Sequence, residues 1–260
     1  MNRSHQPRII FYSRLLLLML TLLPNVIFAT TQPSLTPFEV DYDISRSGLV
    51  IIHTQRRLLQ LGVNEYLFES NSRTAGPISW FIKDRISENS RWQYHQLQPR
   101  PLHYHYQLQG GRRKKHIELN FDWLQNIVSD SERKPVWSSK VTPPTTDKLL
   151  YQLQLMLDLQ TGRKVFNYTI ADSGKIQHYD FKHSGTETIE IPLGSFDTIK
   201  LHRRNGKRAT TIWFAPALDY LPIRIEHLEK DGSVMQANAT RVNGLPTGNQ
   251  NETQLPAPAQ

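Results

Sequence analysis

Four histidines in one stretch are the residues with the most specific chemistry in this sequence: His95, His103, His105 and His116. The spacing of His103 and His105 places two imidazoles on one face of a strand, because side chains alternate along a strand. Zinc or copper would need a third or fourth donor, which neighbouring strands with His95 and His116 could supply. Alternating His, Tyr and Gln on a solvated strand face is the simpler interpretation. We therefore predict no metal site, with His103 and His105 as the only candidates.

Three acidic residues could form a hydrolytic pair: Asp84, Glu88 and Asp122. A glycosidase needs two carboxylates that face each other across roughly 5–10 Å. The alternative is structural, with Asp84 and Glu88 in ion pairs near Arg85 and Asp122 pointing outward between two aromatic residues. The sequence has no Gly-x-Ser-x-Gly elbow, P-loop, dinucleotide fingerprint or His-Glu-x-x-His motif. We therefore predict a non-enzymatic protein without a cofactor.

Large apolar side chains are the candidates for contact with a ligand, because they can hold an acyl chain or stack on a sugar ring. Core packing explains most of them equally well. The residues that we expect to line a cavity are Trp80, Phe81, Trp123, Leu153, Met156 and Trp213.

The densest run of positive charge is Arg112, Arg113, Lys114 and Lys115, directly after two glycines. A solvated hairpin tip is the simpler interpretation, and contact with an anionic surface is the alternative. Without the first 29 residues the chain has 28 Lys and Arg against 23 acids, a net charge of only +5. This mild excess fits lipid headgroups or envelope polysaccharide better than nucleic acid, which we do not expect as a partner.

The N-terminus predicts export. Residues 1–29 combine three arginines, a leucine-rich stretch and Ala29 at a cleavage position, which is typical of a cleavable signal peptide, and Pro24 argues against a longer membrane helix. The chain has no cysteine, so neither disulfides nor a lipid-modified cysteine are possible. We expect a periplasmic protein that is not a lipoprotein and has no transmembrane helix after cleavage.

The remaining chain has the period-two pattern of β-strands. Phe38, Val40, Tyr42 and Ile44 alternate with polar residues, and tight-turn pairs such as Asn205-Gly206 separate later segments. The pattern predicts a mostly β fold of ten or more strands, an antiparallel meander curled into an open or half barrel. We expect a flexible linker over 30–36, one domain over 37–244 and a disordered tail over 245–260.

One helix is predicted, from Lys148 to Leu159. Thr146 or Asp147 can cap its start, and Gly162 can end it. Its apolar residues fall on one arc, with Gln152, Gln154 and Asp158 away from it, so we expect it to pack one face across the concave side of the sheet.

Several short blocks resemble a known family. They include Phe38-Glu39-Val40-Asp41-Tyr42, Thr146-Asp147-x-Leu149-Leu150-Tyr151, Gly194-Ser195-Phe196-Asp197-Thr198 and Trp213-Phe214-Ala215-Pro216. Their order over roughly residues 37–244 is similar to a bacterial exported family known as domain of unknown function 3108. The resemblance implies no reaction, but it implies an envelope location and a curved sheet similar to lipoprotein carriers and receptors.

Three functions are compatible with the sequence. The favoured one is a binding or carrier module that holds a lipid-like ligand in an apolar hollow. The second is an interaction protein that docks another envelope component, and the third is a hydrolase that uses Asp84, Glu88 or Asp122. The sequence does not indicate an oligomeric state.

Overall fold

A computed structural model describes residues 34–246, except residues 82, 112 and 113. The predicted signal peptide, most of the predicted linker and most of the predicted tail lie outside the described residues. Leu35, at the linker's end, is buried, and its N–H donates a 2.9 Å hydrogen bond to the hydroxyl of Tyr94. Leu245 is buried too. The packed domain therefore extends slightly beyond 37–244 at both ends.

Strands dominate the domain, as the alternating pattern predicts. The first eight are β1 (Phe38–Arg46), β2 (Leu49–Gly62), β3 (Glu65–Thr74), β4 (Arg85–His95), β5 (Gln98–Gln109), β6 (Lys115–Asp122), β7 (Ile127–Asp130) and β8 (Trp137–Lys140). The others are β9 (Thr145–Asp147), β10 (Phe166–Asp172), β11 (Lys175–Ile191), β12 (Gly194–Asn205), β13 (Arg208–Ala215), β14 (Leu221–Leu228) and β15 (Val234–Asn243). Two short 3-10 helices, η1 (Pro77–Trp80) and η2 (Pro216–Leu218), interrupt them.

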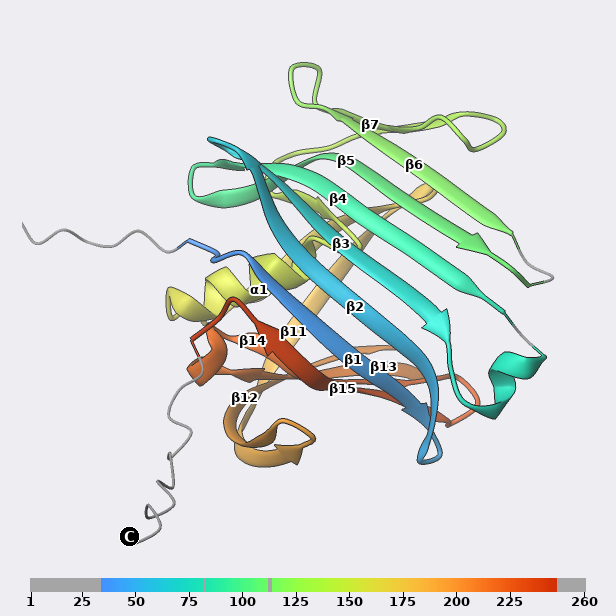
Figure 1. Cartoon of the computed structure of the whole chain (residues 1–260). Helices are drawn as coiled ribbons and strands as arrows, with labels where there is room; N and C mark the ends of the chain where they lie inside the picture. The colour runs from blue at the N-terminus through green and yellow to red at the C-terminus, as the bar shows by residue number, and fades with distance from the viewer. Residues whose placement is uncertain (1–33, 82, 112–113, 247–260) are drawn as a thin grey trace, which may run out of the picture. The chain divides into compact units, whose positions relative to one another are not determined.

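The strands form one sheet that consists of two meanders. The first runs from β1 to β8 and the second from β10 to β15, and within each one sequential strands pair antiparallel. The two are joined where β1 pairs with β15, for example Val40 opposite Val242. The edge strands are β8 and β9, so the sheet is curled but not closed (Figure 1). The mostly β, open-barrel prediction is confirmed.

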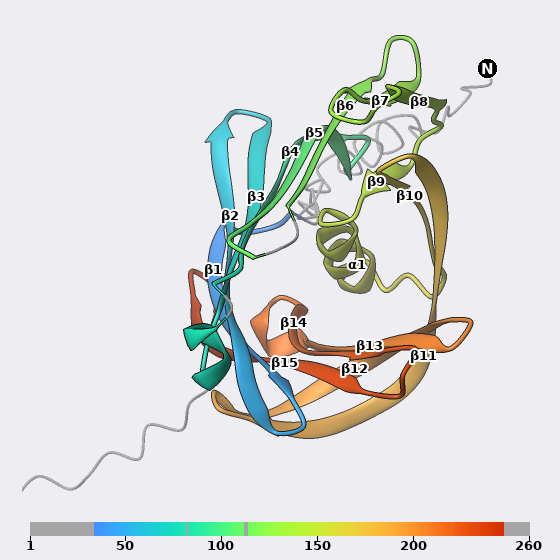
Figure 2. The same ribbon diagram turned by 90° about the vertical axis from the view of Figure 1, so that its right-hand side faces the viewer.

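One pairing departs from the antiparallel prediction. β9 and β10 are parallel, with Thr146 opposite Ile170. A parallel pair needs a crossover connection, and α1 (Tyr151–Gln160) supplies it. The helix lies inside the curve of the sheet (Figure 2). Its end has the hydrogen bonds of a Schellman motif, because the N–H groups of Gly162 and Arg163 donate to the carbonyls of Leu159 and Asp158.

The helix is buried on every side, which corrects the prediction of a helix with one buried face. Leu153 and Met156 are buried as expected, but Gln152, Gln154 and Asp158 are also buried. Each polar side chain has a partner in the interior. Gln152 Oε1 accepts a 2.6 Å hydrogen bond from Arg56, and Asp158 Oδ2 accepts a 2.7 Å bond from the hydroxyl of Tyr168. The helix therefore fills this part of the concave side.

Candidate functional sites on the curved sheet

The two aromatics of the first interruption face solvent. Trp80 ends η1 and is 79% exposed, and Phe81 follows it and is 86% exposed. The expectation that they line the concave interior is therefore wrong. A short apolar turn does form there, as the sequence predicts, but its aromatic side chains point outward at the end of the sheet.

The other four expected cavity residues are also not brought together. Leu153 and Met156 lie in the packed core around α1. Trp123 lies in the turn after β6, where its indole N–H donates a 2.6 Å hydrogen bond to the carbonyl of Pro101. Trp213 shares a cross-strand row with Lys200 and Arg224, on the face opposite to buried Ile212. It is covered by those two cations, so it does not face the helix.

The segment that carries Trp80 and Phe81 has a fixed base. We call residues 75–83 the η1 loop. Thr74 and Asp84 close it, because the N–H of Thr74 donates a 3.1 Å hydrogen bond to the Asp84 carbonyl and the N–H of Asp84 donates a 3.2 Å bond to Thr74 Oγ1. Ala75 is tied to β2 by a 2.8 Å bond to the carbonyl of Ile51. The exposed side chains of Trp80 and Phe81 are therefore carried by a loop whose two ends are hydrogen-bonded to each other and to β2.

Positive charge surrounds the η1 loop. Arg73, Lys83 and Arg85 are exposed beside its two ends. The backbone of Gly110 lies against Lys83 so closely that a Cβ at Gly110 would be 1.9 Å from the Lys83 carbonyl oxygen. This contact brings the predicted basic hairpin to the same end of the sheet. Lys114 and Lys115 are exposed there, while Arg112 and Arg113 lie outside the described residues.

A small apolar pocket lies at the base of the same loop. Its volume is about 200 Å³, and its apolar walls come from Ile51, Ile52 and Ile86, with Thr74 and Asp84 at the loop's base. Sites for whole small molecules usually span roughly 300–1,000 Å³. This pocket is therefore too small to enclose a complete lipid.

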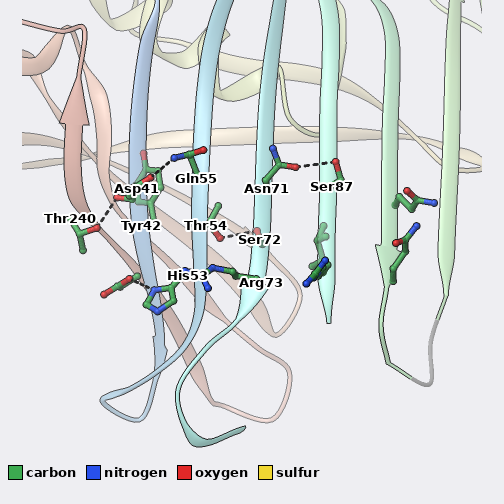
Figure 3. A pocket seen from close by; sticks show the side chains of 15 residues that line it. Asp41, Tyr42, His53, Thr54, Gln55, Asn71, Ser72, Arg73, Ser87 and Thr240 are labelled. Carbon is green, nitrogen blue, oxygen red and sulfur yellow. Dashed lines mark hydrogen bonds and ion pairs between the residues drawn. The ribbon is translucent and has the colours of Figure 1, made fainter. Parts of the chain in front are cut away.

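A polar groove lies on the outer face of the first meander. It has a volume of about 630 Å³ and crosses β1 to β5 (Figure 3). Two cross-strand rows line it, Asp41, Gln55, Asn71, Ser87 and Gln107 in one, and Asp43, His53, Arg73, Arg85 and Gln109 in the other. Hydrogen bonds fix neighbours within the rows. Gln55 donates to Asp41 at 3.2 Å, and Ser87 donates to Asn71 at 3.0 Å.

The three acids proposed for hydrolysis are separate. Asp122 caps the hairpin after β6, where its Oδ1 accepts bonds from the N–H groups of Leu124 and Gln125 at 2.9 and 3.0 Å. Asp84 lies at the base of the η1 loop. Glu88 lies four residues further along the chain, and the hydroxyl of Tyr104 donates a 2.6 Å bond to its Oε1. Burial raises the pKa of the Glu88 carboxyl.

The histidines of the first meander are partly brought together. His105 and His116 lie with their ring centres 5.1 Å apart on the outer face, and Glu118 joins them. His103 contacts Glu118 but not the other two rings directly, and His95 lies at the far end of β4, opposite Gln98. Glu118 was not identified from the sequence, because only the strand register shows that it stands opposite His105. Glu132, whose Oε2 is 3.3 Å from His116 Nδ1, was not identified either, because it lies in the loop after β7.

The fold and these surfaces define a class: an open, curled β-sheet around one helix, with candidate binding surfaces at one end and on the outer face. The family model described as "Protein of unknown function (DUF3108)" matches residues 37–238. The chain therefore belongs to this family.

A solved structure supports the fold. The chain is similar to a β-barrel-like protein of the domain of unknown function DUF1849 from Brucella abortus, with a TM-score of 0.53, 8% identity, and coverage of 81% of this chain and 98% of that one. A protein from Parabacteroides distasonis described as a candidate lipoprotein gives a TM-score of 0.37 and 10% identity, over 81% of this chain and 97% of that one. No curated protein is significantly similar in sequence. Among the described residues, no helix has the length and hydropathy needed to cross a bilayer.

Proposed function

We propose that this protein is a non-enzymatic binding module that attaches to lipid surfaces through its η1 loop. The observation that carries the proposal is the exposure of two adjacent aromatic side chains, Trp80 and Phe81, on a loop with an ordered base. Large apolar residues exposed side by side are costly in water, and they are a common mark of an interaction site. Tryptophan is also enriched at the headgroup level of membranes.

The energy available from this contact is substantial. Moving a large apolar side chain out of water stabilises by about 1.5–3 kcal/mol. Insertion of Trp80 and Phe81 together would thus contribute at least about 3 kcal/mol, which corresponds to roughly a hundredfold in affinity.

The charges near the loop favour an anionic surface. Lys83 and Arg85 flank the aromatics, and Lys114 and Lys115 belong to the neighbouring hairpin. Each cation near an anionic bilayer contributes about 1 kcal/mol, and salt weakens this attraction. The predicted export of the chain would bring it to such membranes.

The size of the apolar pocket limits how much of a lipid it can hold. A pocket of about 200 Å³ beside Ile52 and Ile86 can take the end of an acyl chain, but not a whole lipid. The proposal is therefore attachment at the surface of a lipid assembly, with one chain end entering the pocket. This differs from the enclosed carrier that the sequence favours.

Sedimentation with vesicles tests the proposal. Wild-type protein should bind vesicles that contain phosphatidylglycerol, and the double variant Trp80→Ser/Phe81→Ser should bind about a hundredfold more weakly. The matched control is Val63→Ser/Leu124→Ser, which removes two side chains that are 99% and 97% exposed. They lie in the β2–β3 and β6–β7 turns, at the end of the sheet away from the η1 loop. Equal binding by the two double variants, or no binding by the wild type, would refute the proposal.

The outer groove favours a second candidate function, the docking of another envelope component. Its rows of polar side chains offer a hydrogen-bonding surface across five strands (Figure 3). A photo-crosslinking amino acid at Asn71, in the groove, should give a discrete crosslinked product in cells. The same group at Thr188, on the distant strand β11, should not. Identical crosslinking from both positions would exclude a specific partner in the groove.

A further inference from the structure

A cluster of three metal-binding side chains lies on the outer face of β5 and β6. One ligand atom each from His105, His116 and Glu118 lies within 4.8 Å of the others. Strand register produces this arrangement, because His105 stands opposite Glu118, and His116 is two residues before Glu118 on the same face. Such cross-strand and diagonal neighbours have Cβ atoms about 4.5–8 Å apart, a range that lets their tips meet at one ion.

A second carboxylate contacts His116 from outside the cluster. Its Nδ1 is 3.3 Å from Glu132 Oε2, and its Nε2 is 3.3 Å from Glu118 Oε2. A neutral imidazole that donates from Nδ1 to Glu132 keeps its Nε2 lone pair free, directed at the cluster. Metal-binding histidines typically have such an outer carboxylate, which sets the tautomer and raises the basicity of the ring.

Glu118 is also held from outside. Its Oε1 contacts Nε2 of His103, so its Oε2 remains on the side of His116. His105 has a polar neighbour too, since its Nδ1 is 3.4 Å from Nδ2 of Asn89. Rotation of this carboxamide by 180° would bring its oxygen to Nδ1–H and leave Nε2 of His105 for an ion. Each of the three side chains thus has an outer partner on its second polar atom.

One ligand-to-ligand distance agrees with a small ion bound between the side chains. Two ligands at about 2.0–2.1 Å from a tetrahedral ion are roughly 3.3–3.4 Å apart. Nε2 of His116 and Oε2 of Glu118 have this separation. Two imidazoles with one carboxylate suit zinc and its neighbours among the transition metals, whereas calcium and magnesium prefer oxygen ligands.

We propose that His105, His116 and Glu118 form a zinc site, with Glu132 and His103 as positioning residues. Three protein ligands leave one coordination position for water or for an atom of a partner, because the cluster faces solvent. This proposal departs from the sequence analysis, which predicts no metal site and names His103 and His105 as the candidates. The proposed site keeps His105, takes His116 rather than His103 as the second imidazole, and adds a carboxylate.

Calorimetric titration of the purified chain, without a histidine tag, with zinc chloride alone tests the site. We expect one equivalent of zinc with micromolar or tighter affinity. His116→Gln and Glu118→Gln should each weaken binding by about a hundredfold, and Glu132→Gln by about tenfold. His95→Gln is the matched control, because it removes a histidine of the same meander outside the cluster, and it should change nothing.

Cobalt provides a readout that does not depend on the variants folding. Wild-type protein with one equivalent of cobalt should give the intense visible absorption of a tetrahedral or five-coordinate site. Lack of zinc uptake at micromolar concentration, the weak spectrum of octahedral cobalt, or an equal loss in His95→Gln and His116→Gln would each overturn the proposal.

Discussion

Ser90 on β4 donates a 2.6 Å hydrogen bond to Oδ2 of Asp147, the last residue of β9. The other oxygen of Asp147 accepts the N–H groups of Leu149 and Leu150 at 2.9 and 2.8 Å. One fully buried carboxylate therefore holds the turn that leads into α1 and ties this turn to the first meander. The two halves of the sheet face each other across this helix, so the bond between Ser90 and Asp147 helps to set the curvature of the domain.

Asp147→Ala should destabilise the domain by about 2–4 kcal/mol. The change leaves the N–H groups of Leu149 and Leu150 and the Ser90 hydroxyl without their partner in the interior. Asp122→Ala is the matched control, since Asp122 makes the same kind of double bond to Leu124 and Gln125 in an exposed hairpin. Its cost should be within about 1 kcal/mol in urea unfolding, because water replaces the lost contacts. Equal losses would contradict the assigned role.

The pH dependence of stability should reveal Asp147. Burial raises the pKa of this carboxyl from 3.8 to about 6, so between these values the folded state binds more protons than the unfolded state. Stability from this group is therefore fully present below pH 3.8 and is lost as the pH rises to about 6. Asp147→Asn cannot ionise, so its stability relative to wild type should rise by roughly 3 kcal/mol across this range. A constant difference at every pH would contradict the shift.

Gly110→Ala should disturb the end of the sheet that carries the η1 loop. A Cβ there would lie 1.9 Å from the Lys83 carbonyl oxygen, and Gly110 has a φ of +104°. Gly48→Ala shares the positive φ, at +80°, but has nothing within 4 Å of the new Cβ. We expect about 1 kcal/mol for Gly48→Ala and clearly more for Gly110→Ala in thermal unfolding. Similar losses would show that the contact with Lys83 is not tight.

The stability of Leu153→Ala distinguishes a filled core around the helix from a ligand cavity. Leu153 is fully buried, and its truncation should cost about 2–5 kcal/mol by leaving a void. Leu124→Ala, at a residue that is 97% exposed, should be neutral. A near-neutral Leu153→Ala would indicate space around the helix, and would restore the enclosed carrier that the sequence favours.

The general fold could be predicted from local patterns. Alternation along Phe38, Val40 and Tyr42 and turn pairs such as Asn205-Gly206 depend only on neighbouring residues, and both recur in the structure as β1 and the turn between β12 and β13. The predicted end of the helix near Gly162 follows from capping chemistry and is confirmed. The predicted start at Lys148 is wrong, because Asp147 accepts the N–H groups of a turn over residues 148–150 and α1 begins only at Tyr151. The pairing of β1 with β15 could not be predicted, since it joins residues about 200 positions apart.

The candidate sites could not be predicted, because they depend on the tertiary environment of each residue. Trp80 and Trp213 have the same residue type, but one is exposed on a loop and the other is covered by Lys200 and Arg224. Hydrophobicity alone cannot distinguish these environments. The same holds for Glu118, whose partners His105 and His116 become visible only through the register of β5 and β6.

Quenching of tryptophan fluorescence by lipids with brominated acyl chains tests the central claim most directly. The chain has five tryptophans, and Trp80 is the one that the proposal inserts into the bilayer. We predict strong quenching of the wild type on anionic vesicles and its loss in Trp80→Phe, which should still bind because an apolar ring remains. Unchanged quenching in Trp80→Phe, or bound wild-type protein without any quenching, would contradict attachment through the η1 loop.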